Sequence, residues 1–380
     1  MMREKASMEK LLFQVIKVII IFSPLEHVIG VEKIFYLTGC LVALSVALIR
    51  KVIYVDETCS LIIFVLYAAT TCYWTENILP LMDLFNTAVM YFFLFLILQR
   101  SYSSQEYEQL KIAVVLQGWV LLALCFAFGT YRDNRFWIIT STTGADPNYL
   151  SGWFILPVSV ATGYIIEKKN LILKILFLAE VVLALYFITE SASRSGLLCN
   201  TFSIVAVVMY LLRGEMKRHP IYGIVGIIIF IVVCFIGVSM LPSYTLYRFM
   251  NASDAGSLGG RTQIWSNLIS ILLNKPIGLL FGMGQGSAPL YSGFNSVAHN
   301  TFLDILFENG LIGLSIYLYF FIVSLKRALK KDIVIGISMI SICILIFTLS
   351  STYMRFLIFM LFMADCHVED EDNVLKTCTN

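Results

Sequence analysis

Charge is scarce in this sequence. Only 14% of its 380 residues are charged, whereas 59% are hydrophobic. Soluble proteins carry about 25% charged residues and about 45–50% apolar ones. A soluble domain of this length could not hide so much apolar surface, so the composition excludes a soluble enzyme and indicates a membrane protein. The 27 Lys and Arg residues form no long basic tract, which argues against nucleic-acid binding.

The sequence also lacks the features of a disulfide framework, of a cleavable signal peptide and of a sugar-nucleotide transferase, which narrows the class of protein. Its nine cysteines are scattered, most of them in or beside apolar runs, which favours packing residues over a disulfide framework. The first apolar stretch lacks a small-residue cleavage site, so we expect no cleavable signal peptide. The one Asp-x-Asp pattern, Asp370 to Asp372, lies in an acidic tail typical of a solvated end, which argues against a cytoplasmic sugar-nucleotide transferase.

What the sequence does contain is a series of apolar stretches that could cross a bilayer. A spanning helix needs roughly 20 mainly apolar residues. The candidate spans are 11–27, 34–49, 58–74, 79–98, 112–129, 149–166, 171–189, 196–213, 221–241, 300–324, 333–350 and 352–364. They predict an all-α polytopic membrane protein of about twelve helices, with a single integral membrane domain over 1–380.

The distribution of Lys and Arg predicts the orientation of these spans. If the N-terminus is inside, 18 of the 27 basic residues lie in inner segments and eight in outer ones, with Lys17 inside the first span. Cytoplasmic loops are enriched in Lys and Arg. We therefore expect both termini to be cytoplasmic and the longest connection, 242–298, to be extracytoplasmic.

The outer segments contain two arginines that invite a chemical interpretation. In "LGGRTQIWSNLISILL", Arg261 precedes a stretch with the apolar pattern of a helix lying in the membrane interface. The apolar face consists of Ile264, Trp265, Leu268, Ile269 and Leu272. A helix N-terminus attracts anions, so Arg261 there suggests a phosphate clamp, although it could also face lipid head groups. In "TESASRSGLL", Arg194 precedes the span 196–213, where it could instead be a snorkelling arginine.

Two turn-like segments flank these arginines in the chain. "FGMGQG" places Gly282, Gly284 and Gly286 in a flexible turn that lacks the Lys and Ser/Thr of a Walker loop. In "ADPNYL", Asp146 and Asn148 are suited to capping the following span, and they could also face a site.

The stretch "SVAHNTFLDILFENGLIGL" places polar groups at the start of a membrane helix. If the helix begins near His299, then Asn300, Asp304 and Glu308 lie on one face, because they are spaced four residues apart. Polar residues at such a position are expected to face a cavity or the bundle interior. His299 could be a structural hydrogen-bonding residue. At a helix N-terminus, however, its imidazole would be held neutral, as a proton acceptor requires.

Taken together, these stretches resemble the O-antigen ligase and polysaccharide polymerase family of bacterial membrane glycosyltransferases. The resemblance rests on "DPNYL" at 146–150, "SRSG" at 193–196, "GGRTQIW" at 259–265, and "FGMGQG" followed by "HNTFLDILFENGLIGL" at 299–314. It covers an O-antigen ligase-related region at 146–325. It implies a GT-C-like fold in the bacterial plasma (inner) membrane, with short amphipathic helices in the extracytoplasmic loop.

The resemblance also implies a chemistry. It is an inverting glycosyl transfer at the outer face, with no metal and no cofactor, from a glycan carried on undecaprenyl diphosphate. Arg194 and Arg261 would bind the donor diphosphate, and His299 would take the proton from the acceptor hydroxyl or orient that hydroxyl. The residues expected to contact substrate are Asp146, Asn148, Trp265, Gly284, Asn300, Asp304 and Glu308.

The family includes two activities with the same motifs. A polymerase joins repeat units into O-antigen or capsule, whereas a ligase moves the finished glycan to lipid A-core or another acceptor. The compact chain favours the polymerase, whose candidate partners would include chain-length regulator and flippase proteins. A lipid-linked glycan flippase is the alternative from another class. Transporters tend to have repeated halves and a midplane site, and neither pattern is evident in the sequence.

Overall fold

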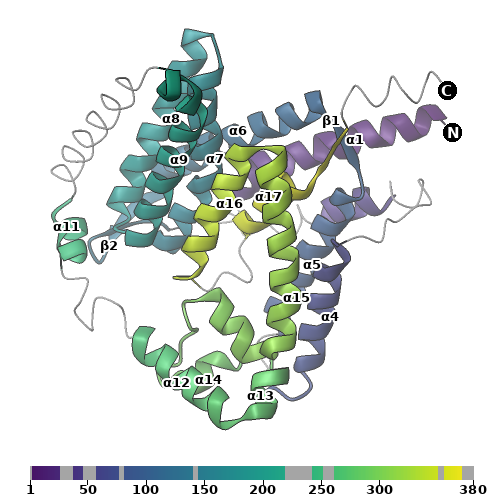
Figure 1. Cartoon of the computed structure of the whole chain (residues 1–380), viewed down its shortest axis with the longest axis vertical. Coiled ribbons are helices and arrows are strands. Elements are labelled where there is room, and N and C mark those ends of the chain that lie inside the picture. The colour runs from purple at the N-terminus through teal and green to yellow at the C-terminus, as the bar shows by residue number, and fades with distance from the viewer. Residues whose placement is uncertain are drawn as a thin grey trace.

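A computed structural model of the chain describes residues 2–25, 37–45, 57–76, 81–139, 144–218, 242–250, 261–349 and 355–369, and these residues are mostly helical (Figure 1). The helices are α1 (Met2–Phe22), η1 (Ser23–Leu25, 3-10), α4 (Cys59–Thr71), α5 (Leu81–Leu98), α6 (Ser104–Phe128), α7 (Pro147–Glu167), α8 (Leu171–Glu190), α9 (Arg194–Arg218), α11 (Ser243–Met250), α12 (Arg261–Asn274), α13 (Pro276–Phe281), α14 (Ala288–Tyr291), α15 (Thr301–Lys331), α16 (Ile333–Ile346) and α17 (Arg355–Asp365).

Five of the described helices are long and apolar enough to cross a membrane, namely α6, α7, α8, α9 and α15. Three shorter apolar helices cover Cys59–Thr71, Thr87–Leu98 and Ile333–Ile346. The polytopic helical architecture is therefore confirmed, whereas the number of twelve spans is not. The expected span 221–241 lies outside the described residues, as do the two ends of the expected span 34–49, whose middle, 37–45, is helical.

The first and last predicted spans do not meet the same criterion. Helix α1 begins earlier than expected, and it has too many charged residues to be among the helices that could cross a membrane. Helix α17 has only 11 residues, about half the length that a bilayer requires. Figure 1 shows α1 lying across the direction of α4 and α15.

Two small sheets were not predicted from the sequence. Strands β2 (Gly129–Arg132), β3 (Arg135–Ile139) and β4 (Gly144–Ala145) form an antiparallel sheet before α7. Strand β1 (Ser101–Ser103) pairs in parallel with β5 (His367–Glu369), joining segments far apart in the chain. These strands are two to five residues long, too short for an alternating hydrophobic pattern to reveal them.

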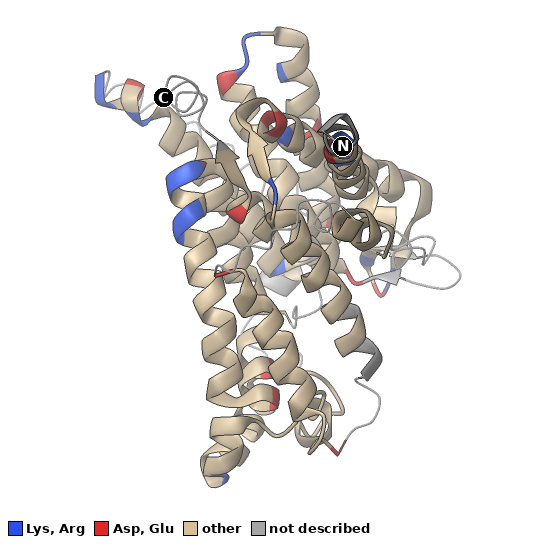
Figure 2. Ribbon diagram, turned by 90° about the vertical axis from the view of Figure 1, so that its right-hand side faces the viewer, with Lys and Arg blue, Asp and Glu red and all other residues tan. Residues whose placement is uncertain are grey.

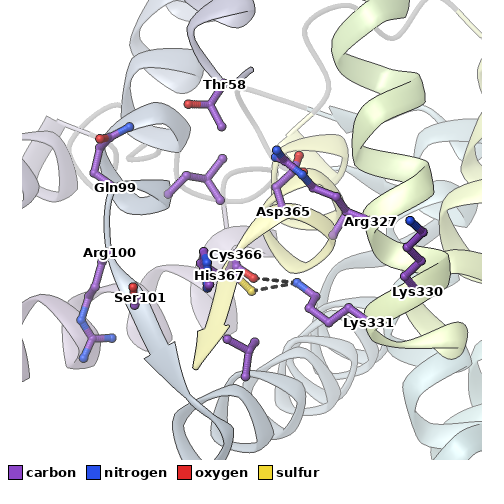
Figure 3. Close-up of a pocket in the computed structure, with 13 residues that line it drawn as sticks. Thr58, Gln99, Arg100, Ser101, Arg327, Lys330, Lys331, Asp365, Cys366 and His367 are labelled. Carbon is purple, nitrogen blue, oxygen red and sulfur yellow. Dashed lines mark hydrogen bonds and ion pairs between the residues drawn. The ribbon is translucent and has the colours of Figure 1, made fainter. Parts of the chain in front are cut away.

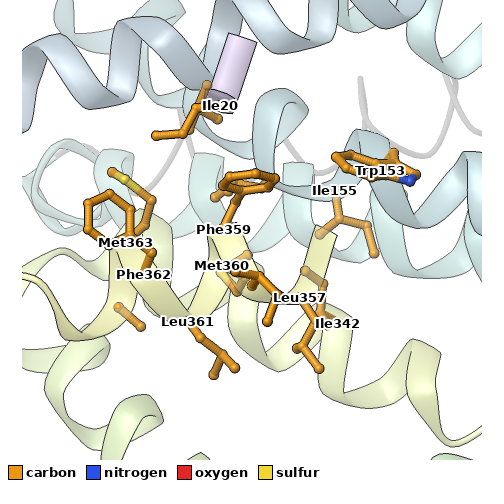
Figure 4. Packing of buried hydrophobic residues seen from close by; sticks show 14 of the residues in the cluster. Ile20, Trp153, Ile155, Ile342, Leu357, Phe359, Met360, Leu361, Phe362 and Met363 are labelled. Atoms are coloured by element: carbon orange, nitrogen blue, oxygen red, sulfur yellow. The ribbon is translucent and has the colours of Figure 1, made fainter. Parts of the chain in front are cut away.

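Helix α7 occupies the centre of the protein. It packs against α6, α8, α9 and α16, and most of its side chains are buried. A helix that is apolar on all sides requires such surroundings. Figure 4 shows where α7 meets the last helices: Trp153 and Phe359 have ring centroids 6.3 Å apart, with Ile155 and Ile342 nearby.

The two ends of the molecule differ in charge. In Figure 1, α12, α13 and α14 lie at one end of the long axis, and α1 and β1 lie toward the other. Figure 2 shows most Lys and Arg residues toward the end where α1 lies. Helices α7, α9 and α15 all begin on the side of α12–α14, so their N-termini share one end.

Helix α15 is interrupted near its start. Gly310 has φ 66° and ψ −173°, a combination that is essentially restricted to glycine. The backbone N–H groups of Met283 and Gly284 donate to the carbonyls of Phe307 (2.8 Å) and Glu308 (3.0 Å), which precede the break. The glycine-rich turn thus satisfies carbonyls that the broken helix cannot.

Candidate functional site

The start of α7 is tied to the start of α9 through one amide side chain. The Asn148 Oδ1 atom accepts hydrogen bonds from Ser193 Oγ (3.0 Å) and from Arg135 Nη2 (3.2 Å). Asp146 caps α7, its carboxylate accepting the backbone N–H of Asn148 at 2.7 Å. The sequence indicated Asp146 as a capping residue, but Arg135 was not among the predicted site residues.

The "SRSG" segment packs tightly against α7. Ser151 Oγ donates to Ser193 Oγ at 3.2 Å, and a Cβ atom added to Gly196 would lie 1.9 Å from Ser151 Oγ. Glycine is therefore the residue that permits this close approach. Arg194 follows Ser193 as the first residue of α9, so the structure places it at a helix N-terminus beside that of α7.

Helix α12 begins at Arg261, as the sequence predicted. Ile264, Leu268 and Leu272 form its buried face, whereas Ile269 is 45% exposed and does not belong to it. The buried face is thus narrower than predicted because it packs on one side only, against residues around the start of α15. Trp265 is half-buried, and its indole N–H donates to the Ala298 carbonyl at 2.7 Å.

His299 lies in the short loop before α15. Its φ of 53° is left-handed, which is uncommon for any residue other than glycine and tends to occur at functional sites. The residue before His299 is held in place, because the Asp304 carboxylate accepts the Ala298 N–H at 2.8 Å. His299 Nε2 lies 3.3 Å from Ser296 Oγ.

Helix α15 begins at Thr301 rather than at His299. The Asn300 Oδ1 atom caps it, accepting the N–H groups of Phe302 and Leu303 at 3.1 Å each. Capping occupies the amide oxygen of Asn300, a residue that the sequence predicted to contact substrate. Asn300 therefore has a structural function that accounts for its place in the motif.

Three of the predicted site residues, His299, Arg261 and Asp146, interact electrostatically. Burial lowers the pKa of His299 from its usual value, the charge of Arg261 lowers it further, and Asp146 acts in the opposite direction. The net effect is a lowered pKa, so the imidazole is neutral near neutral pH. Burial and Arg261, rather than a helix dipole alone, produce the neutral ring that the sequence interpretation required.

One tyrosine belongs to the same group and was missed. The Tyr149 hydroxyl is close enough to Asp146, Asp304 and Arg261 to interact electrostatically with all three. Tyr149 stands inside the "DPNYL" motif, so its position was available from the sequence. A tyrosine beside an expected cap gave no signal that distinguished it from a packing residue.

Glu308 and Gly284 belong to a second network rather than to the one around His299. Glu308 Oε2 accepts from Gln285 Nε2 at 2.9 Å, and the Asn309 amide donates to Gln285 Oε1 at 3.2 Å. A Cβ atom on Gly284 would lie 2.6 Å from Thr75 Cα. The predicted stripe on α15 is therefore divided: Asp304 fixes the His299 loop, and Glu308 fixes the glycine turn.

The end of α4 and the loop after it hold this second network in place. Tyr67 Oη donates to the Phe281 carbonyl (3.1 Å), Trp74 Nε1 to the Gly282 carbonyl (3.2 Å), and Thr75 Oγ1 to the Gln285 carbonyl (2.8 Å). Residues 57–76 contributed only hydropathy to the sequence interpretation. The contacts depend on a tertiary approach that no local pattern reveals.

The segment that contains most of these residues is similar to a known protein family. Residues 179–318 match the model of the O-antigen ligase family. This segment is similar to an O-antigen ligase domain. No curated protein matches the chain. The matched segment includes Arg194, Arg261 and His299, whereas Asp146 and Asn148 precede it. The match, together with the apolar helices, indicates a membrane protein of surface-glycan biosynthesis.

Proposed function

We propose that this protein is a glycosyltransferase that polymerises oligosaccharide repeat units carried on undecaprenyl diphosphate at the outer face of the bacterial plasma membrane. The observation that carries the proposal is the joint electrostatic action of Arg261 and Asp146 on a half-buried His299, whose pKa is lowered by desolvation and by Arg261. These residues supply an anion-binding cation, a balancing carboxylate and a proton acceptor at one place.

The diphosphate of the donor would bind at the N-terminus of α12. The backbone N–H groups of a helix N-terminus and the helix dipole attract a phosphate, and the Arg261 guanidinium can bind its oxygens in a bidentate manner. Arg194 occupies the same position on α9 and would bind the second phosphate. Two guanidinium groups can stabilise a departing diphosphate without a metal ion, so we expect no divalent cation to be required.

His299 would act on the acceptor sugar. Its neutral imidazole accepts the proton of the acceptor hydroxyl while the hydroxyl oxygen attacks the anomeric carbon. The bond from that carbon to the donor phosphate breaks, and the diphosphate leaves with its lipid. Attack from the face opposite the leaving group inverts the anomeric centre. Positioned proton acceptors of this kind contribute typically about 10²–10⁴-fold to the rate.

The second candidate is an O-antigen ligase, and the name of the matched family favours it. The two activities differ in the acceptor and share the chemistry at the donor. The compact chain favours the polymerase, which needs to bind two lipid-linked glycans of the same kind.

The proposal is tested with purified protein in proteoliposomes and a donor repeat unit on undecaprenyl diphosphate. A polymerase converts the donor alone into a ladder of longer products and releases the lipid diphosphate, also in excess chelator. A ligase makes product only when lipid A-core is added. No product under either condition, or strict dependence on added magnesium or manganese, contradicts the proposed chemistry.

Substitution of arginine tests the diphosphate site. We expect Arg261→Lys to lose donor binding and turnover nearly as fully as Arg261→Ala, because lysine retains the charge but not the planar fork. Arg132→Lys is the matched control, since Arg132 lies at the end of β2, is mostly exposed and pairs with Asp133 at 3.8 Å. Full activity of Arg261→Lys would reduce Arg261 to a contact with lipid head groups.

A further inference from the structure

Arg135, the first residue of β3, links the end of α8 to the start of α7. Its Nε atom donates to the Ser191 carbonyl at 3.0 Å, and its Nη2 atom donates to Asn148 Oδ1 at 3.2 Å. Ser191 is the C-cap of α8, and Asn148 lies in the first turn of α7. Because the guanidinium is planar and rigid, the two bonds fix one helix end relative to the other.

The turn between α8 and α9 is fixed at the same point. Ala192 in this turn is fully buried and has a left-handed φ of 51°, a conformation that persists only where the surroundings enforce it. Ser193 Oγ donates at 3.0 Å to Asn148 Oδ1, the atom that Arg135 also binds. Arg194 follows as the first residue of α9. The contacts that fix the turn before Arg194 therefore converge on one amide oxygen.

The packing of α7 against α9 has contacts of its own, apart from Arg135. Asn200 Nδ2 donates to the carbonyls of Ser151 and Gly196 at 2.9 Å each. All three of these residues are buried. We therefore expect a change at Arg135 to leave this pair of helices intact and to loosen only the turn before α9.

The two hydrogen bonds of Arg135 differ in kind from the ion pairs of Arg327. At the far end of α15, Arg327 pairs with the carboxylates of Asp365 (3.2 Å) and Glu57 (2.6 Å), and Figure 3 shows Arg327 beside Asp365. The acceptors in the two bonds of Arg135 are a carbonyl oxygen and an amide oxygen, which carry no net charge. These two bonds set geometry and neutralise no carboxylate.

We propose that Arg135 is a positioning residue for the donor diphosphate: it fixes the turn before α9 so that Arg194 can bind the second phosphate. The inference rests on the proposed function, in which Arg261 binds one phosphate and Arg194 the other. Lysine cannot replace Arg135, because a single ammonium on a flexible chain does not reproduce two donors at a fixed angle. Arg135 acts through Arg194, without touching the donor.

The test compares the binding of two lipids to the full-length protein, purified in a non-ionic detergent. The probes are undecaprenyl diphosphate and undecaprenyl monophosphate. The variants are Arg135→Lys, Arg135→Gln, Arg194→Ala, and Arg194→Ala combined with each change at position 135. Arg132→Lys is the matched control, because Arg132 is the register partner of Arg135 in the β2–β3 hairpin and its side chain is 69% exposed.

We expect wild type and Arg132→Lys to bind the diphosphate more tightly than the monophosphate. Both changes at position 135 should weaken diphosphate binding about tenfold, the effect of losing an oriented, charge-assisted contact. Monophosphate binding should change by less than about twofold, because one phosphate is still bound at Arg261. In the Arg194→Ala background the changes at position 135 should have no further effect, since both residues act on the same phosphate.

Three results overturn the inference. An equal loss of both lipids means a general loosening of the protein. A further loss in the Arg194→Ala background means that Arg135 acts independently of Arg194. Unchanged binding by Arg135→Lys, with or without a loss in Arg135→Gln, means that the geometry of the guanidinium is not needed.

The Arg194→Ala variant separates this inference from the proposed function. If it keeps the wild-type preference for the diphosphate, the proposed role of Arg194 fails and the inference fails with it. If it loses that preference while both changes at position 135 keep it, only the inference about Arg135 fails.

Discussion

At the scale of single residues, the backbone of His299 decides how its chemistry can be tested. Its left-handed φ means that alanine would disturb the loop as well as remove the imidazole. Asparagine and glycine tolerate this conformation better. We expect His299→Asn and His299→Gly to fold and bind donor as wild type does, while turnover falls about 10²–10⁴-fold. Turnover per folded molecule, measured with matched expression, checks this, and near-normal turnover in either variant would remove His299 from the mechanism.

Asp146 offers a test of the charges around His299. The carboxylate acts to raise the pKa of His299, so its removal should lower that pKa further. The neutral imidazole would then persist to more acidic conditions. Asparagine caps a helix as well as aspartate, which preserves the start of α7. We therefore expect Asp146→Asn to move the acidic limb of the pH–rate profile to lower pH. A limb that stays in place or moves to higher pH would show that another group titrates there.

At the scale of elements, the break in α15 depends on a glycine. A Cβ atom on Gly310 would lie 2.3 Å from the Leu280 carbonyl oxygen, and its φ of 66° is unfavourable for alanine. The backbone conformation alone costs a non-glycine residue about 1–3 kcal/mol. We expect Gly310→Ala to lower the unfolding temperature markedly. Gly214→Ala in α9 is the control, because nothing lies within 4 Å of its Cβ position, and it should be neutral or slightly stabilising. Equal unfolding temperatures for the two variants would refute this account.

The sequence predicted those parts of the site that depend on local periodicity. Helix α12 and its start at Arg261 follow from an amphipathic repeat, and Asp146 follows from its capping chemistry. The separation of Asp304 from Glu308 could not be predicted, because it depends on the contact of Gln285 with a broken helix. The contact of Arg135 with Asn148 likewise requires β3 to fold back beside α7, which no spacing in the chain encodes.

At the scale of the whole molecule, the distribution of charge predicts a sidedness that labelling can check. Ser270 in α12 and Lys217 near the end of α9 are both exposed. We expect a membrane-impermeant maleimide to label Ser270→Cys in intact spheroplasts and Lys217→Cys only after lysis, in a background without the native cysteines. Lys and Arg gather toward the end of the molecule where α1 lies, and this end should be cytoplasmic. The reverse labelling pattern would invert the topology and place the proposed transfer on the wrong side of the membrane.

The contacts from the end of α4 and the loop after it bear on how this protein could be recombined with its relatives. The segment matched to the family, 179–318, contains the glycine turn but not Tyr67, Trp74 or Thr75, which hold that turn by its carbonyls. It also omits the start of α7. The matched segment therefore depends on contacts with residues outside it. A hybrid that exchanges this segment alone would place a foreign glycine turn against the native residues 57–76. A hybrid that also exchanges 57–76 and 144–167 would keep the residues on both sides of these contacts from the same protein.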